Sequence, residues 1–117
     1  STGFMTERTL DAAKLLAERG ISVAVLHVST IKPFDKSAVQ EFAAGVDRVV
    51  TAENHVVVGG LASLVVETLF DEGIAKEVTR IGLPDRYIEC GAVPTLQERY
   101  GLTTKAIVAR IVGLQKD

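Results

Sequence analysis

Residues 49–60 read Val-Val-Thr-Ala-Glu-Asn-His-Val-Val-Val-Gly-Gly, and this stretch carries the strongest structural signal in the chain. Its apolar, β-branched start predicts a buried strand over residues 48–52. Two adjacent glycines then open a segment, residues 60–71, whose apolar residues recur at helical spacing: Leu61, Leu64, Val65, Thr68 and Leu69. A strand, a polar triplet and a helix in this order indicate an open α/β sheet. Such folds carry their functional residues on loops at the carboxyl ends of the strands.

The sequence on either side of this stretch alternates between helical and strand patterns. Helices are expected over residues 7–19, 36–44 and 103–114, with a further helical turn starting at the capping box Thr95-Leu96-Gln97-Glu98. Additional strands are expected over residues 21–29 and 78–81, and Asp35 is expected to cap the second helix. Strands separated by helices form right-handed crossovers in a parallel sheet. We therefore predict a three-layer α/β/α domain with an open, mainly parallel sheet.

The composition limits the classes of function. A chain of 117 residues with 47% hydrophobic and 24% charged residues is typical of one globular domain. A formal charge of −2 with interspersed signs gives no basic surface for nucleic acid, and no apolar run has the length of a membrane span. The single cysteine, Cys90, is compatible with a reducing compartment. We expect a cytoplasmic protein with neither nucleic acid nor membrane as a partner.

The first residues have an unusual arrangement. Ser1-Thr2-Gly3-Phe4 directly precedes a predicted helix, whereas a small-residue turn of this kind usually follows a strand. Three predicted strands are also few for a sheet that is covered on both faces. We therefore expect residues 1–117 to form one domain that lacks its first strand. The alternative is an N-terminus that simply begins in a loop.

An ordered series of short motifs covers nearly the whole chain. The series comprises Thr2-Gly3, Leu10-Asp11-Ala12-Ala13, Gly20-Ile21, Ile31-Lys32-Pro33-Phe34-Asp35, Val49-Val50-Thr51-Ala52-Glu53-Asn54-His55, Gly59-Gly60-Leu61-Ala62-Ser63, Gly82-Leu83-Pro84-Asp85-Arg86-Tyr87, Glu89-Cys90-Gly91 and Tyr100-Gly101-Leu102. In this order the motifs resemble the C-terminal domain of the transketolase family. That family depends on thiamine diphosphate and includes transketolase, 1-deoxyxylulose-5-phosphate synthase and the β chains of 2-oxo acid dehydrogenases. The Glu-Asn-His triplet and the Tyr-Gly-Leu motif look most like bacterial transketolase, in particular the smaller chain of its split form. The alternatives within the family are the C-terminal domain of 1-deoxyxylulose-5-phosphate synthase and that of a 2-oxo acid dehydrogenase β chain.

The resemblance implies a part in transferring two-carbon ketol units between sugar phosphates. In such enzymes thiamine diphosphate, held with Mg²⁺, performs the difficult chemical step. The family's Gly-Asp-Gly motif, which holds the diphosphate and the cation, does not occur in this chain. The cofactor-activating glutamate belongs to the family's middle domain. We therefore expect no catalytic, cofactor-binding or metal-binding residue here, and no activity of the chain alone.

The implied role is that of a scaffold. The domain would pack against the middle and N-terminal cofactor-binding domains, or against the subunit that carries them, and would support a homodimer of the complete enzyme. The residues expected at the interface or at the rim of the active site are Glu53, Asn54, His55, Gly59, Gly60, Ser63, Asp85 and Arg86.

Each of these residues also has a simpler interpretation. Glu53, Asn54 and His55 can satisfy the backbone of their own loop, and Gly59 and Gly60 can serve tight packing instead of anion binding. Asp85 and Arg86 can form a local ion pair. A function of a different class, a stand-alone anion-binding regulatory module, also stays open. His27 is expected in the core, and Cys90 is expected to be a packed or partly buried thiol.

Overall fold

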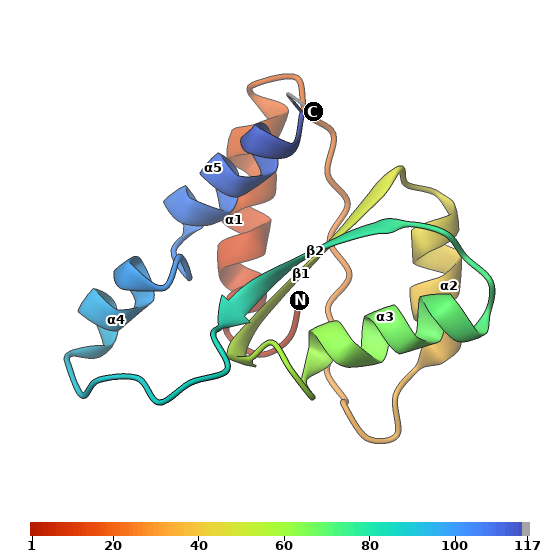
Figure 1. The fold of residues 1–117 in the computed structure, drawn as a ribbon. Coiled ribbons are helices and arrows are strands. Elements are labelled where there is room, and N and C mark those ends of the chain that lie inside the picture. Colours follow the sequence, from red (N-terminus) through yellow and green to blue (C-terminus); the bar gives the residue numbers. More distant parts are fainter. Residues whose placement is uncertain (116–117) are drawn as a thin grey trace.

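A computed structural model describes residues 1–115 of the chain (Figure 1). The elements follow in the order α1 (Met5–Ala17), α2 (Lys36–Ala44), β1 (Arg48–Val56), α3 (Leu61–Asp71), β2 (Glu77–Leu83), α4 (Val93–Arg99) and α5 (Thr104–Leu114). Strands β1 and β2 pair in parallel, with Arg48 opposite Glu77 and Ala52 opposite Ile81, and the register shifts before Val56. Helix α3 is the crossover between them, so this central unit confirms the predicted α/β fold with a parallel sheet.

The helices cover both faces of the sheet, as the three-layer prediction requires. Helices α1 and α5 lie on one side of the strands and α2 and α3 on the other (Figure 1). The first face buries Met5, Ala12, Leu16, Ala52, Ile81, Leu102, Ile107 and Val108, and the second buries Val39, Ala43, Leu61, Val65 and Leu69. These two separate apolar clusters show that the strands divide the core. No helix of the described residues has the length and apolar character needed to cross a bilayer.

The expected strand over residues 21–29 is wrong as a paired strand. The segment is extended and its side chains alternate as in a strand: Ile21 and Val23 pack on the α1 side, and Leu26 and Val28 on the α2 side. It forms no ladder with β1 or β2. The alternation of apolar side chains indicates which faces of the segment are buried. A β-ladder also requires a neighbouring strand within hydrogen-bonding distance, and alternation does not indicate whether one is present.

Two further boundaries differ from the sequence prediction. Strand β1 continues to Val56, so Glu53, Asn54 and His55 lie in its irregular end and not in a separate loop. Helix α4 begins at Val93 with Pro94 in its first turn and has no side-chain cap. The predicted capping box at Thr95 is therefore wrong. Proline at a helix start needs no N–H donor and already has a helical φ, which explains the earlier beginning.

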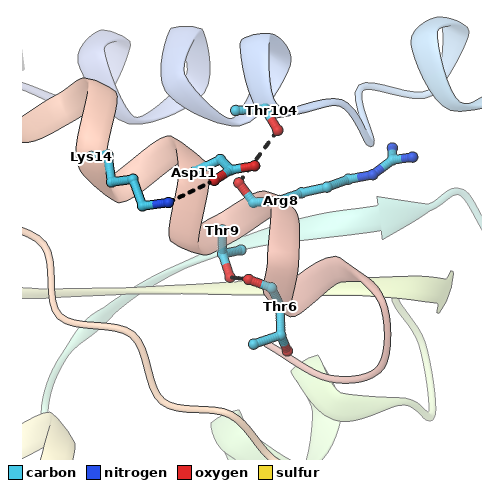
Figure 2. A network of polar contacts seen from close by, with 6 residues as sticks. All are labelled: Thr6, Arg8, Thr9, Asp11, Lys14 and Thr104. Carbon is cyan, nitrogen blue, oxygen red and sulfur yellow. Dashed lines mark hydrogen bonds and ion pairs between the residues drawn. The ribbon is translucent and has the colours of Figure 1, made fainter.

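Contacts between the two ends of the chain hold α1 against α4 and α5. The Arg8 guanidinium donates to the carbonyl of Leu102 and, over 2.6 Å, to Gln97 Oε1, and it lies 5.1 Å from the centre of the Phe4 ring. The Thr104 hydroxyl lies 3.5 Å from the Arg8 carbonyl oxygen (Figure 2). Because this cation bonds a backbone carbonyl and a side-chain amide together, it fixes the turn between α4 and α5.

The Asp35 cap was predicted and provides a test of helix α2. Its Oδ1 accepts from the Ala38 amide over 3.0 Å, as expected of an N-cap aspartate. Asp35→Ala should lower the free energy of unfolding by about 1 kcal/mol, because one amide at the helix start loses its acceptor. Urea unfolding followed by circular dichroism measures the loss. Asp35→Asn keeps an acceptor oxygen and should stay close to wild type, and equal losses in both variants would contradict the assignment.

Candidate functional site

The carboxylate of Glu53 joins the end of β1 to the start of α3. The side chain is only 1% exposed. Its Oε2 accepts from the Leu61 amide over 2.8 Å and its Oε1 from the Ala62 amide over 2.9 Å. These amides belong to the first turn of α3, where backbone N–H groups have no partner within the helix. The negative charge also lies at the positive end of the helix dipole, so both hydrogen bonds are charge-assisted.

Two glycines make room for this carboxylate. A Cβ on Gly60 would lie 2.0 Å from Glu53 Oε2 and 3.1 Å from His55 Nδ1. A Cβ on Gly82, in the neighbouring strand β2, would lie 2.8 Å from the His55 carbonyl oxygen and 3.2 Å from Glu53 Cγ. Any side chain at either position would push Glu53 or the end of β1 aside. Close packing therefore accounts for Gly60.

Gly59 and Ser63 hold the short connection between β1 and α3. Gly59 has a φ of +78°, a left-handed conformation that costs glycine little. Its amide donates to Ser63 Oγ over 2.8 Å. The hydroxyl of Ser63 thus satisfies the backbone of its own loop.

Asn54 and His55 are exposed on the outer side of the same strand end. The ring Nδ1 of His55 lies 2.8 Å from the Val56 carbonyl oxygen. Because a carbonyl only accepts, Nδ1 carries the proton and Nε2 is the acceptor of the neutral ring. Asn54 and His55 therefore present polar groups to the surroundings, whereas Glu53 is buried beneath them.

Asp85 and Arg86 reach this end of the sheet from β2. Val56 pairs with Leu83, and the Val57 amide donates to the Leu83 carbonyl over 3.0 Å, so the segment after β2 leaves the sheet beside the end of β1. Both Asp85 and Arg86 are exposed. The local ion pair between them is absent from the ion pairs of residues 1–115, so that interpretation is wrong. The structure instead places both side chains on the surface at the carboxyl end of the strands.

The start of α3 is poorly suited to a phosphate. The Leu61 and Ala62 amides, which would bind an anion at this helix end, already donate to Glu53. A phosphate there would have to displace a buried carboxylate and would meet its negative charge. For the same reason Glu53 is not free to ligate a cation, and these residues do not fit the diphosphate and metal of the family's cofactor.

The sequence prediction missed one polar cluster, formed by Glu89, Arg99 and Tyr100. The Tyr100 hydroxyl donates to Glu89 Oε2 over 2.6 Å, and the Arg99 guanidinium pairs with Glu89 Oε1. The hydrogen bond from Tyr100 and the nearby Arg99 lower the pKa of Glu89 to about 2, and the same hydrogen bond raises the pKa of Tyr100. Arg99 and Tyr100 follow Glu89 by ten and eleven residues, a spacing that matches neither helical nor strand periodicity. The sequence alone therefore does not predict this cluster, which depends on the path of the loop.

Two further expectations are wrong. His27 is exposed, with Nδ1 2.7 Å from the Thr6 hydroxyl, and does not lie in the core. Cys90 is exposed and is neither a packed nor a partly buried thiol. The valine-rich surroundings in the sequence predict an interior His27, but His27 faces away from the cluster that Leu26 and Val28 join.

Comparison with known proteins identifies the family. The family model described as the transketolase C-terminal domain matches residues 1–107. An uncharacterized transketolase family protein of Sinorhizobium fredii, y4mN, is 48% identical over 95% of this chain and 33% of its own length. The 1-deoxy-D-xylulose-5-phosphate synthase of Methylacidiphilum infernorum is 42% identical over 99% of this chain and 18% of its own length.

A solved structure agrees with these relatives. A split gene transketolase, described as an inactive beta4 tetramer, superimposes with a TM-score of 0.84 and 40% identity, over 92% of this chain and 35% of the other. The fold and the sequence thus define a C-terminal α/β domain of the thiamine diphosphate-dependent enzymes. The chain belongs to the transketolase family. It spans a third or less of the length of the two relatives described above.

The contact between Glu53 and α3 predicts which substitutions the domain tolerates least. Glu53→Ala should lower the free energy of unfolding by about 2 to 4 kcal/mol, because two buried amides lose their acceptor and a cavity is left. Gly60→Ala should cost about 2 to 3 kcal/mol through steric overlap with the carboxylate. Chemical denaturation measures both. The matched control is Gly113→Ala, where a Cβ meets nothing within 4 Å, and it should be neutral or slightly stabilising.

The Glu89 cluster predicts a titration. Because the folded pKa of Glu89 is lowered from 4.5 to about 2, its contacts should stabilise the fold fully above about pH 4.5 and weaken as the pH falls toward 2. A carbon-13 NMR titration of the side-chain carboxyl should find its midpoint near pH 2. Tyr100→Phe removes the hydrogen bond that lowers the pKa of Glu89 most, so it should move the midpoint to a higher pH. An unchanged midpoint in that variant would contradict the assigned hydrogen bond.

Proposed function

We propose that this chain is the C-terminal scaffold domain of a transketolase that transfers two-carbon ketol units between sugar phosphates. Thiamine diphosphate and Mg²⁺ would be held by the middle and N-terminal domains, or by a subunit that carries them. The chain would support a homodimer of the complete enzyme, and would be inactive alone.

The observation that carries the scaffold role is the use of Glu53. The buried carboxylate at the strand end, where an open α/β sheet usually presents its chemistry, is fully engaged by the amides of α3. Gly60 and Gly82 pack closely against it, since an added Cβ would lie 2.0 Å from Glu53 Oε2 at Gly60 and 3.2 Å from Glu53 Cγ at Gly82. The only buried carboxylate that the described residues place at this strand end therefore has a structural role, because it joins β1 to α3.

The exposed residues around Glu53 support a role at an interface. Asn54 and His55 at the end of β1, and Asp85 and Arg86 after β2, all lie at the carboxyl end of the sheet. Their side chains offer an amide, an imidazole, a carboxylate and a guanidinium, groups that suit hydrogen bonds across a polar protein interface. We assign this surface to contacts with the cofactor-binding portion or with the second subunit.

The similarity to a split gene transketolase favours transketolase chemistry. That neighbour shares 40% identity with the chain, and its description as an inactive beta4 tetramer fits a portion that needs another to act. The 42% identity to a 1-deoxy-D-xylulose-5-phosphate synthase supports a second candidate, the corresponding domain of such a synthase. A stand-alone anion-binding module is disfavoured because Glu53 already occupies the amides that would bind the anion.

An activity reconstitution tests the proposal. The purified chain should show no ketol transfer from xylulose 5-phosphate to ribose 5-phosphate with thiamine diphosphate and Mg²⁺. The same assay should become positive after adding the cofactor-binding portion of the same enzyme. Activity only with pyruvate and glyceraldehyde 3-phosphate would favour the synthase instead. Turnover by the chain alone, or failure of the two portions to associate, would overturn the proposed function.

A further inference from the structure

The connection between β2 and α4, residues 84–92, makes few contacts with the rest of the domain, and we call it the arm. It leaves the carboxyl end of β2 and runs to α4 (Figure 1). Within it only Pro84 and Ile88 are half-buried, and the other residues are exposed. Among the residues that the structure describes, no amide from Tyr87 to Ala92 donates to a backbone carbonyl. The domain's own core therefore does not account for the arm.

The arm presents large apolar side chains to the surroundings. Tyr87 is fully exposed, and Val93, the first residue of α4, is 63% exposed. Single exposed apolar residues are common on protein surfaces, but here two of them flank the half-buried Ile88 in one short stretch. Tyrosine is also enriched among the residues that contribute most to protein interfaces, because its ring buries a large area with few rotatable bonds. The arm therefore has the composition of a contact segment.

The Glu89 contacts hold this exposed arm in one conformation. Glu89 Oε2 accepts from the Tyr100 hydroxyl over 2.6 Å, and its Oε1 pairs with the Arg99 guanidinium. The Tyr100 ring in turn packs against the apolar cluster on the α1 and α5 face, so the carboxylate ties the arm to the core. A segment that is already ordered loses less conformational entropy when it binds. Glu89 is therefore a positioning residue for the arm.

The position and the charge of the arm indicate what it contacts. The arm contains Asp85 and Arg86, so it continues the exposed surface at the carboxyl end of the sheet. These two residues have opposite charges, and the charge of Glu89 is balanced by Arg99. An arm without net charge and with an exposed aromatic ring fits an apolar pocket with a polar rim, and not a strongly charged surface.

We propose that Tyr87 anchors the arm in an apolar pocket on the cofactor-binding portion of the enzyme, and that the Glu89 contacts preorganise the arm for this docking. The inference rests on the proposed function and deepens it, because it names the segment and the side chain that make the contact. The binding partner is the portion that carries thiamine diphosphate, since the arm extends the same surface that we assign to that portion.

Binding of the chain to the cofactor-binding portion, measured by isothermal titration calorimetry, tests the anchor. Tyr87→Ala should raise the dissociation constant at least about tenfold, whereas Tyr87→Phe keeps the ring and should stay within about threefold of wild type. The matched control is Phe70→Ala, because Phe70 on α3 is another exposed aromatic residue, at 85%, and lies outside the arm. This control should bind as wild type does.

A double-mutant cycle tests the positioning role of Glu89. Glu89→Ala should raise the dissociation constant about threefold or more, because the released arm has to be ordered on binding. In the Tyr87→Ala background the same substitution should change the dissociation constant by less than about twofold, since no anchor is left to position. The wild-type dissociation constant should vary by less than about threefold between about 0.05 and 0.5 M salt, as an apolar contact requires.

The outcomes distinguish this inference from the proposed function. If the wild-type chain binds and Tyr87→Ala binds equally well, or Phe70→Ala loses as much affinity, the anchor is wrong and the proposed function stands. Additive effects in the double-mutant cycle, or a steep salt dependence, would also overturn the inference. Self-association of the chain that Tyr87→Ala abolishes would assign the arm to a second copy instead. If the wild-type chain does not bind the cofactor-binding portion at all, the proposed function and this inference both fail.

Discussion

The contact between the Glu53 carboxylate and the first amides of α3 is the constraint on which the rest of the sheet depends. It joins the irregular end of β1 to the crossover helix with two charge-assisted bonds of 2.8 and 2.9 Å. The start of α3 therefore lies at a fixed position over the sheet, and Leu61 and Val65 follow into the core. Without side-chain-free positions at Gly60 and Gly82, the same carboxylate could not enter.

This arrangement separates the polar residues of the strand end into two groups. The inner group is the buried Glu53, which satisfies the amides at the start of α3. The outer group, Asn54 and His55, remains exposed. This exposed group is the surface that we propose for contact with another portion of the enzyme.

The sequence predicts most of this fold but only part of the site. Periodicity locates α3 and α5 well, because one face of each helix is buried and the pattern reports burial directly. It also finds the alternation of residues 21–29, but it cannot show whether a neighbouring strand is present to pair with them. Glu53 stands out as part of a polar triplet, whereas its capping of a helix eight residues later depends on how closely the backbone approaches at Gly60 and Gly82. The Glu89 and Tyr100 pair depends likewise on the path of a loop.

The Arg8 contacts have a consequence for how the domain assembles. Arg8 and Leu102 are separated by 94 positions in the chain, and Arg8 and Gln97 by 89. Contacts of such high sequence separation form late, because a long loop has to be closed before they are made. During synthesis the first helix emerges long before its final neighbours exist. The part of α1 that packs against α5 therefore stays uncovered until α5 has left the ribosome.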